Sequence, residues 1–464
     1  MIKIHLFDWI IIYSYIIILI YYGVISRFKK KLSEKDFILS GRKLSLTGFI
    51  ATLVTTWYGA ILGIGENTYL YGIQTWFIFS LPYYFFALLY AIWISKKVRE
   101  AGHVSIPDQF RYHYGEQAGI ISALILSFLS SPAPYILSMG LLIQFLFGIE
   151  LGIALIFSTF FSIIYIWNGG FPAVVRTDIF QFILMFGGFI LLFWFLCIKI
   201  QNPISMLNQL PTNYLDPLGG NSIQYILVWF FIAAWTFIDP GFYQRCAAAD
   251  TTTTARNGIL YAIGFWAIFD FFTIFCGLYA ISNLQINQAT LVFPNLAVNI
   301  LPIGIFGIFI TGILATIMST IDSLSLVCAI SFGRDILWRI NNDYNNKSII
   351  PFIQKGLIII SIISIFLAYL LPSIVELFYT IGSLLIPGLI LPFLNTLGKK
   401  ENKFNKKEAL HWIIWPIIIS SIWFTISKFG KSPFLGIEPF YPGMIVSFIY
   451  FLIHIIKGKL WQLK

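Results

Sequence analysis

Long apolar segments separated by short loops make up most of this chain, and they decide where it can fold. A helix needs roughly 20 apolar residues to cross the hydrocarbon core of a bilayer. Only 11% of the 464 residues are charged, whereas a soluble domain carries about 25%. The sequence therefore predicts an all-α integral membrane protein, a single polytopic domain over residues 1–464. We expect thirteen spans, at residues 8–27, 45–71, 74–95, 118–147, 150–167, 178–200, 223–242, 257–282, 300–332, 354–371, 373–397, 410–427 and 439–457.

Lysine and arginine are concentrated in alternate loops. Of the 30 basic residues, 26 lie in the segments 27–44, 96–117, 168–177, 243–256, 333–355, 398–411 and 457–464. The opposite side keeps Lys3, Lys199, Lys428 and Lys431. Because basic loops stay in the cytoplasm, we expect the N-terminus outside and the C-terminus inside the plasma (cytoplasmic, or cell inner) membrane. The net charge of +10 then reflects orientation in the bilayer, and no nucleic-acid partner is expected.

Residue clusters typical of enzymes and metal centres are missing from the predicted spans. The four cysteines form no CxxC pair, so we expect them to pack as small apolar side chains. The five histidines lie at or near loops, and no loop has the glycine-lysine pattern that binds ATP phosphates. We therefore expect no enzyme and no cofactor. Work on a solute would draw on an ion gradient or on the gradient of the solute itself.

The second predicted span contains three closely spaced glycines. Gly59, Gly63 and Gly65 precede Glu66, and each glycine costs about 1 kcal/mol in a helix interior relative to alanine. This pattern favours a helix that unwinds inside the membrane and presents backbone carbonyls to a cavity. The alternative is close helix packing through small residues.

The ninth predicted span carries a group of hydroxyl side chains. Thr316, Ser319, Thr320 and Ser323 fall on one helical face, with Asp322 beside them. Hydroxyl and carboxylate oxygens suit a hard monovalent cation such as Na⁺. Alternatively, each hydroxyl bonds to the carbonyl four residues earlier, but that explanation leaves the carboxylate of Asp322 without a role.

Other acidic residues in the spans have several local explanations. Asp178 opens the sixth span. There it would cap the helix, form an ion pair with Arg176 or take part directly in the function of the protein. The sequence Asp239–Pro240–Gly241 is expected to end a helix before the cytoplasmic run 244–249. Asp270 and Glu376 receive no role. Among the aromatic residues, those beside the breaks are of interest, namely Trp57, Tyr58, Trp229 and Trp235.

Five motifs, in order along the chain, resemble the sodium:solute symporter family over nearly its whole length. The motifs are Asp36–Arg42, the Gly169–Gln181 segment with its Ala-Val-x-x-Thr-Asp-x-x-Gln pattern, Gln244–Arg245 with the alanines that follow, Met318–Thr320 with Asp335–Ile336 downstream, and Tyr379–Ser383 before Pro387–Gly388.

The resemblance implies a fold of the leucine-transporter (LeuT) type. Its two inverted repeats of five helices would cover residues 45–200 and 223–397, each with a broken first helix. An additional N-terminal span would occupy residues 1–27, and two C-terminal spans would occupy residues 410–457.

The resemblance also implies a sodium site between the second and ninth spans. Its ligands would be the backbone carbonyls of Thr55, Tyr58 and Thr316 and the hydroxyls of Ser319 and Thr320. A second cation site would involve Asp178, Asp322 and Ser323 together with Ser319.

The solute does not follow from the resemblance, because the residues that select it vary within the family. Candidates to contact it are Trp57, Gly59, Glu66, Trp229 and Trp235. Glu66 would pair either with a cationic or zwitterionic solute or with a structural partner inside the bundle.

The sequence as a whole predicts a sodium-coupled symporter that imports a small organic solute by alternating access. Its partners would be the sodium ion, the solute and the lipid bilayer. A proton-coupled or uncoupled carrier is the nearest alternative, motivated by Asp178 and Asp322. A transporter-like sensor is less favoured, because the predicted tail of about eight residues leaves no room for a signalling domain.

Overall fold

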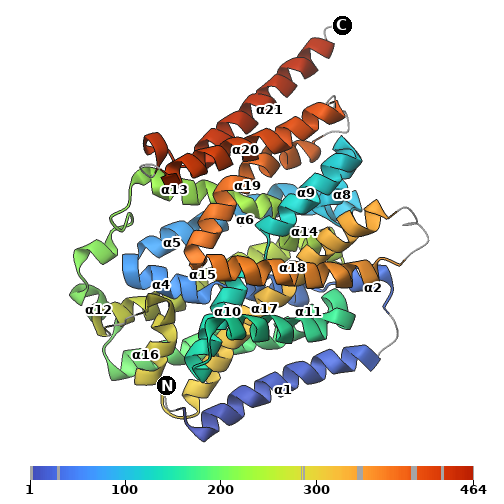
Figure 1. Cartoon of the computed structure of the whole chain (residues 1–464). Helices are drawn as coiled ribbons and strands as arrows, with labels where there is room; N and C mark the ends of the chain where they lie inside the picture. Colours follow the sequence, from blue (N-terminus) through green and yellow to red (C-terminus); the bar gives the residue numbers. More distant parts are fainter. Residues whose placement is uncertain are drawn as a thin grey trace.

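The computed structural model describes residues 4–28, 32–283, 285, 288–341, 348–371, 373–398, 405–429 and 433–462. In these ranges the regular structure is helical, apart from one parallel bridge between Leu44 and Ala249. Each predicted apolar segment lies in one or more of these helices (Figure 1). The all-α prediction is therefore confirmed for the described part of the chain.

The helices follow one another closely along the sequence. The α-helices are α1 Leu6–Phe28, α2 Glu34–Leu39, α3 Leu46–Trp57, α4 Ile61–Tyr71, α5 Gln74–Phe79, α6 Leu81–Leu89, α7 Ser95–Ala101, α8 Ile106–Tyr114, α9 Glu116–Leu129, α10 Ala133–Phe147, α11 Leu151–Lys199, α12 Pro203–Gln209, α13 Ile223–Ile232, α14 Pro240–Ala248, α15 Thr252–Asn283, α16 Val292–Ile300, α17 Ile305–Ala329, α18 Ile350–Leu370, α19 Ile374–Thr396, α20 Lys406–Phe429 and α21 Phe440–Gln462. Short 3₁₀ segments are η1 Ser40–Arg42, η3 Thr212–Leu215, η4 Ala233–Ile238, η5 Ala289–Leu291 and η8 Phe434–Gly436, and π-helical segments are η2 Tyr90–Ile94 and η6 Ile330–Trp338.

Not every predicted span is long enough to cross a bilayer by itself. Nine described helical segments meet the length and hydropathy that a crossing requires, and α3 with α4 forms a tenth span bent by 52°. The other three predicted spans correspond to shorter apolar helices, Leu6–Tyr21, Leu151–Ile164 and Phe440–Ile456. The described residues thus support nine or ten spans, and the count of thirteen is not confirmed.

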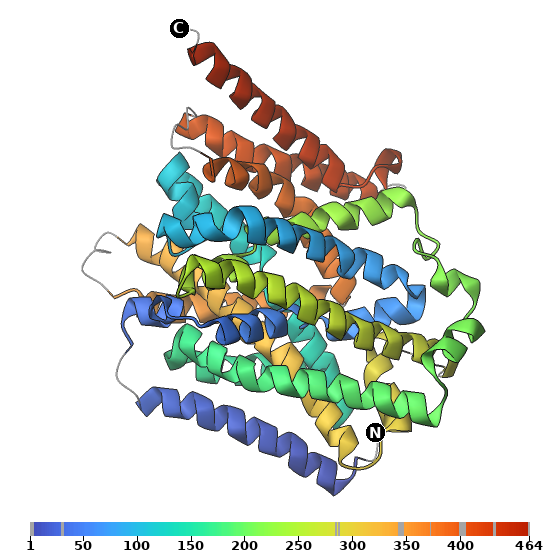
Figure 2. The ribbon, with the colours of Figure 1, turned by 180° about the vertical axis from the view of Figure 1, so that it is seen from behind.

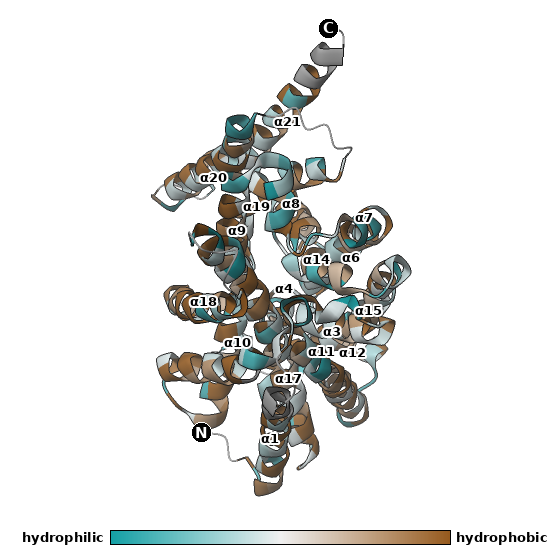
Figure 3. Cartoon of the chain, turned by 90° about the vertical axis from the view of Figure 1, so that its right-hand side faces the viewer, coloured by the Kyte–Doolittle hydropathy of each residue, from teal (hydrophilic) through white to brown (hydrophobic). Residues whose placement is uncertain are grey.

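The spans form one bundle around α17. This helix packs against α1, α3, α10, α11 and α18, and its apolar window is buried completely inside the protein. From behind, α11 and α15 lie side by side, with α1 at the outer edge (Figure 2). Peripheral helices are apolar on the outside, as the brown α9 and α18 show in Figure 3. On α18, Ile358, Ile362 and Phe366 form an exposed stripe, as lipid contact requires.

A glycine divides α11 into two spans. Gly170 has φ 51° and ψ −153°, and a Cβ there would lie 2.5 Å from the carbonyl oxygen of Phe37. The helix resumes directly after this residue, so the expected loop 168–177 is largely helical. Asp178 consequently lies roughly two turns inside a helix and not at its start. The side chain of Arg176 is exposed and donates to the carbonyl of Pro172, so capping and an Arg176 ion pair are both wrong for Asp178.

The seventh predicted span is also interrupted. It runs through α13 and the 3₁₀ segment η4, and it resumes as α14 after Asp239, whose Oδ1 accepts a hydrogen bond from the backbone N–H of Phe242 at 2.8 Å. The expected helix end is therefore a break followed by a new helix. Gln244 and Arg245, expected in a cytoplasmic loop, are buried in α14.

The described parts of most of the basic loops lie at the right-hand end of the molecule in Figure 1, beside α2 and α8, which we call the basic end. There Asp108 of α8 accepts from Arg111 at 2.8 Å and from Arg334 at 2.7 Å. Burial raises the pKa of Asp108, but the two arginines outweigh it and hold this pKa below its ordinary value. Ser105 donates to Asp335 at 2.8 Å. These contacts join α8 to the end of the central α17–η6 helix.

At the opposite end, Asp8 of α1 is expected to anchor the start of α17. Its Oδ1 accepts from the backbone N–H groups of Gly304 at 2.7 Å and Gly307 at 2.8 Å, and the side chain is buried. Loss of such a cap costs about 1–2 kcal/mol. Asp8→Ala should therefore lower the melting temperature of the detergent-purified protein, whereas Asp8→Asn, which keeps an acceptor oxygen, should retain most of it. Equal melting temperatures for Asp8→Ala and the unmodified protein would contradict this role.

Candidate functional site

The break between α3 and α4 lies against the central helix. Residues 58–60 separate the two helices, which are bent by 52°. A Cβ on Gly59 would lie 2.4 Å from the Cβ of Thr320, so only glycine allows this approach. The predicted break within the second span is thus confirmed at Gly59. Gly63 and Gly65 instead lie inside α4, where a Cβ would meet Ile374 and Phe293, so the alternative of close packing holds for them.

Three of the five predicted sodium ligands meet at this contact. The Thr320 hydroxyl lies 3.3 Å from the carbonyl oxygen of Thr55 and 3.2 Å from that of Thr316. Ser319 lies one residue earlier, and all four residues are fully buried. The fifth, Tyr58, stands at the break, but its carbonyl accepts from Ile61 at 2.9 Å and its hydroxyl donates to the carbonyl of Trp266 at 3.0 Å.

Some hydroxyls near the break do bond back along their own helix. Thr316 donates to the carbonyl of Gly312 at 2.7 Å, and Thr55 donates to that of Ala51 at 2.9 Å. The Thr320 hydroxyl likewise donates to the carbonyl four residues earlier, that of Thr316, at 3.2 Å. These side-chain hydroxyls are therefore occupied. The backbone carbonyls of Thr55 and Thr316, which the prediction named as ligands, face the Thr320 hydroxyl.

Asp178 lies beside this group and joins three helices. From α11, its Oδ1 accepts from Ser319 of α17 at 2.6 Å, and its Oδ2 accepts from Thr52 of α3. The carboxylate is fully buried. Because a buried charge is retained only with hydrogen bonds and a counter-charge, Asp178 needs a cation nearby.

Arg245 provides such a charge, and sequence reasoning missed it. The side chain is 0% exposed, and its Nη2 donates to the hydroxyls of Thr52, Thr56 and Ser323 at 2.8, 2.7 and 3.1 Å. Asp178 and Asp239 both interact electrostatically with the guanidinium. The sequence did contain a signal of its burial. A cysteine and three alanines follow this arginine, whereas a solvent-exposed loop would carry polar residues.

The predicted second cation site is not assembled as one cluster. Ser323 lies 2.9 Å from Thr56 and contacts Arg245, whereas Asp322 accepts from Ser162 in the first half of α11. Among the described residues, no hydrogen bond joins Asp322 to Asp178, and the Oδ2 atom of Asp322 has no partner. Asp178 shares only Ser319 with the first site.

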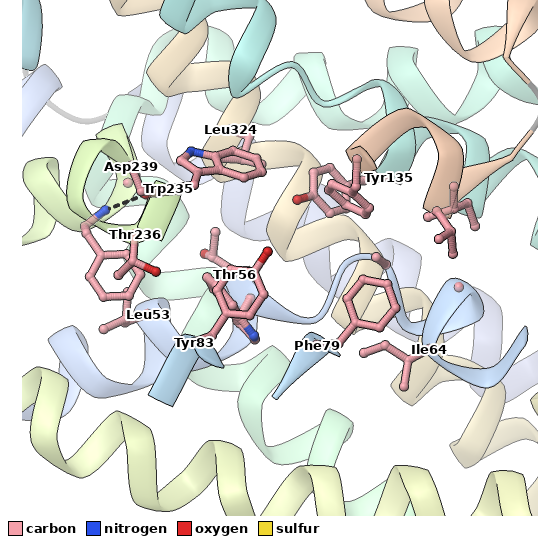
Figure 4. Close-up of a pocket in the computed structure, with 18 of the residues that line it drawn as sticks. Leu53, Thr56, Ile64, Phe79, Tyr83, Tyr135, Trp235, Thr236, Asp239 and Leu324 are labelled. Carbon is pink, nitrogen blue, oxygen red and sulfur yellow. Dashed lines mark hydrogen bonds between the residues drawn. The ribbon is translucent and has the colours of Figure 1, made fainter. Parts of the chain in front are cut away.

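A cavity of about 90 Å³ adjoins the break and Arg245 (Figure 4). Its wall is contributed by α3, α4, α5, α6, α10, η4, α14, α17 and α19. Seven of its residues are aromatic, namely Trp57, Phe79, Tyr83, Tyr135, Trp235, Phe242 and Phe378. The polar remainder is Thr56, Thr236, Asp239 and Arg245. The cavity is thus a mainly aromatic chamber between the two broken helices.

The structure divides the five candidates for solute contact. Trp57 and Trp235 line the cavity, whereas Gly59 packs behind it against Thr320. Trp229 is fully buried and packs on Phe79 with ring centroids 4.9 Å apart. Glu66 is outside the lining, and its Oε2 is buried without a hydrogen-bond partner among the described residues.

Two acids without a sequence-based role have local partners. Asp270 of α15 is buried and accepts a hydrogen bond from Tyr84 of α6. Glu376 of α19 forms an exposed ion pair with Lys428 at 3.4 Å. Neither residue lines the cavity.

Comparison with known proteins identifies the family. A sequence model of the sodium:solute symporter family matches residues 37–414. The chain belongs to this family. The resemblance inferred from the five motifs is thereby confirmed, and the relatives of this symporter-family protein are transporters, not enzymes.

Several characterised relatives are similar over most of the chain. The high-affinity choline transporter 1 of Caenorhabditis elegans is 24% identical over 84% of this chain and 74% of its own length. The sodium/pantothenate symporter of Haemophilus influenzae is 25% identical over 63% of this chain and 64% of its own length. The sodium/glucose cotransporter of Vibrio parahaemolyticus is 24% identical over 88% of this chain and 83% of its own length.

The fold resembles that of solved transporters. A Na⁺-coupled sialic acid symporter in a substrate-bound outward-open state superimposes with a TM-score of 0.80 over 98% of both chains, at 19% identity. Mhp1, a nucleobase-cation-symport-1 family transporter, gives a TM-score of 0.59 at 12% identity, with 93% of this chain and 96% of Mhp1 covered. These similarities support the predicted architecture of the helical bundle.

Replacing Arg245 with lysine should destabilise the protein. The guanidinium contacts the hydroxyls through Nη2 and the Gly241 carbonyl through Nη1. The single nitrogen of a lysine cannot occupy both positions, and each lost hydrogen bond to a charged group costs about 1.5–3 kcal/mol. We expect a lower melting temperature in detergent for Arg245→Lys. Arg256→Lys, at an exposed position of α15, is the matched control and should melt like the unmodified protein. If the two variants melted alike, the bridging role of Arg245 would be wrong.

Proposed function

We propose that this protein is a sodium-coupled symporter that imports a small organic solute by alternating access. The observation that carries the proposal is the group of buried oxygen atoms where the α3–α4 break contacts α17: the carbonyls of Thr55 and Thr316 lie around the Thr320 hydroxyl. Ser319, the preceding residue of α17, donates its hydroxyl to Asp178 beside this group. Uncharged oxygen ligands of this kind suit a hard monovalent cation.

The sodium ion would hold the two halves of the bundle together. Its ligands come from α3 on one side and α17 on the other, so binding favours the conformation in which the break lies against α17. Tyr58 would add a carbonyl if the turn at the break opens. Asp178, which accepts from Ser319, supplies negative charge close to the ion. Of the three residues proposed for a second cation, the contacts favour Asp178 alone, since Asp322 and Ser323 face other partners.

Ion and solute would be coupled because they share structural elements. The α3 helix and the break contribute both to the ion site and, through Thr56 and Trp57, to the wall of the cavity. Inward movement of each positive charge would gain about 2.3 kcal/mol per 100 mV of membrane potential. A change in the position of α3 relative to α17 would therefore affect ion and solute together.

The arrangement in the membrane follows from the distribution of charge. We infer that the basic end faces the cytoplasm, with the N-terminus outside and the C-terminus inside the plasma membrane. The two repeats would cover residues 45–200 and 223–397. In support, the first span of each is interrupted, at residues 58–60 in one and at Asp239 in the other.

Sodium should raise the melting temperature of the purified protein in a saturable manner, which KCl at equal ionic strength should not reproduce. Ser319→Ala and Thr320→Ala each remove one ligand and should raise the NaCl concentration needed for half of the effect by about tenfold, which corresponds to about 1.4 kcal/mol. Thr311→Ala, on the same helix but bonded to the Gly307 carbonyl, is the control and should behave like the unmodified protein.

Two results would count against this assignment. Unchanged sodium dependence in both Ser319→Ala and Thr320→Ala would exclude these hydroxyls as ligands. Equal responses to NaCl and KCl would exclude a sodium-specific site. In that case a proton-coupled or uncoupled carrier would become the better description. The buried Asp322 would be the candidate residue for binding the proton.

A further inference from the structure

The aromatic cavity presents one accessible formal charge to a solute. Two charged side chains, Asp239 and Arg245, are among its lining residues. They differ in exposure, because the Arg245 side chain is 0% exposed whereas Asp239 is partly exposed. In Figure 4, Asp239 lies at one end of the chamber beside Trp235. A solute that enters the cavity therefore meets a carboxylate and not a guanidinium.

The two terminal nitrogens of Arg245 already form hydrogen bonds within the protein. Its Nη2 contacts Thr52, Thr56 and Ser323, and its Nη1 donates to the carbonyl of Gly241 at 3.2 Å. The remaining Nε atom is buried and has no hydrogen-bond partner among the described residues. A solute carboxylate would reach the Nη2 atom only by displacing hydroxyls of α3 and α17, so the cavity favours a cation over an anion.

The charge of Asp239 is only partly balanced by its surroundings. The start of α14 contributes about half a positive charge, and Asp239 accepts from Phe242 there. Arg245 is shared between Asp239 and the fully buried Asp178. The two negative charges of Asp178 and Asp239 are thus balanced by one guanidinium and the partial charge of one helix terminus. The carboxylate of Asp239, which opens to the cavity, therefore keeps a net negative charge.

Aromatic rings surround the volume next to this carboxylate. Trp57 stands edge-on to Tyr83, with centroids 4.7 Å apart and planes at 70°, and edge-on to Phe242 at 6.2 Å and 82°. Trp57 and Trp235 are both partly exposed to the cavity. Aromatic faces attract organic cations through their quadrupoles, most strongly when the cation is removed from water.

The lining offers little to a sugar or another polyhydroxylated solute. It contains no Asn, Gln, Glu, His or Lys among the described residues. The hydroxyl of Thr236 donates to the carbonyl of Ala233 at 2.9 Å, and that of Thr56 is held by Ser323 and Arg245. Specific recognition of many hydroxyl groups needs a matching set of free donors and acceptors, and the described lining offers few beyond the hydroxyls of Tyr83 and Tyr135 and the indole N–H of Trp235.

We propose that the cavity binds an organic cation, a quaternary ammonium or a protonated amine, whose charge lies between Asp239 and the faces of Trp57 and Trp235. This assignment rests on the proposed function, because it assumes that the transported solute occupies this chamber. The hydroxyls of Tyr83 and Tyr135, which line the same space (Figure 4), would orient a polar group at the other end of the cation.

The test compares a cation with its neutral isostere. Purified full-length protein in detergent, at saturating NaCl, is titrated with tetramethylammonium, choline and 3,3-dimethylbutan-1-ol, which has the shape of choline without its charge. Melting temperature and tryptophan fluorescence are recorded. We expect saturable binding of both cations and at least about tenfold weaker binding of the neutral alcohol, because it loses the interactions with the carboxylate and the rings.

Variants then assign the charge to one residue. Asp239→Asn keeps an oxygen for the Phe242 N–H but removes the charge, and it should weaken choline binding at least about tenfold while leaving the neutral alcohol unaffected. Asp250→Asn, which removes an exposed acid beyond α14, is the matched control. If Asp239→Asn does not fold, Trp57→Leu serves as the second variant and should weaken choline binding relative to the neutral alcohol.

Failure of this inference is distinguishable from failure of the proposed function. The sodium-specific stabilisation is measured first, without any solute, and its absence would argue against the sodium site alone. If that stabilisation is present but neither cation binds, or the neutral alcohol binds as well as choline, the cation assignment is overturned. Saturable binding of propionate in place of the cations would also overturn it and would indicate that Arg245 becomes available to an anion.

Discussion

The complete burial of α17 is the constraint on which the rest of the structure depends. A helix without a solvent-exposed or lipid-exposed face must satisfy every polar side chain within the protein, because an unpaired buried polar group costs several kcal/mol. Ser319 therefore bonds to Asp178, and Ser323 bonds to Arg245. Thr320 reaches the backbone of α3 at the break. Through these contacts, the polar face of one helix fixes the positions of α3, α11 and α14 around it.

Breaks in the surrounding helices are tolerated for the same reason. Irregular backbone at membrane depth persists only where it is buried in protein or lines a polar cavity. The break at residues 58–60 packs on α17, and the break at Asp239 is capped by its own carboxylate. Both breaks border the aromatic chamber. The α3 helix and its break contribute both to the proposed ion site and to the lining of the cavity, and this overlap is the physical basis on which the two would be coupled.

Particular residues show how far sequence reasoning reached. The break near Gly59 was predictable, because glycines at that spacing are costly in a helix. The hydroxyl-bearing face of the ninth span was predictable, because helical periodicity places Thr316, Ser319, Thr320 and Ser323 on one side of the helix. By contrast, Asp178 was expected at a helix start and Arg245 in a loop. Local signals such as Gly-Gly or Pro-Gly show where a helix is interrupted, but they do not show that the next residues continue as a buried helix.

The sequence by itself determined the environment, the helical class, the family and the position of the first break, because these depend on apolar length, charge distribution, local propensity and short motifs. Tertiary structure alone decided which charges are buried together and which one faces the cavity. Arg245 and Asp178 lie far apart in the chain, and only packing of α14 and α11 against the same helices brings them close. Exposure of Asp239 to the cavity that Trp57 also lines likewise depends on how two broken helices meet, which no local pattern of residues encodes.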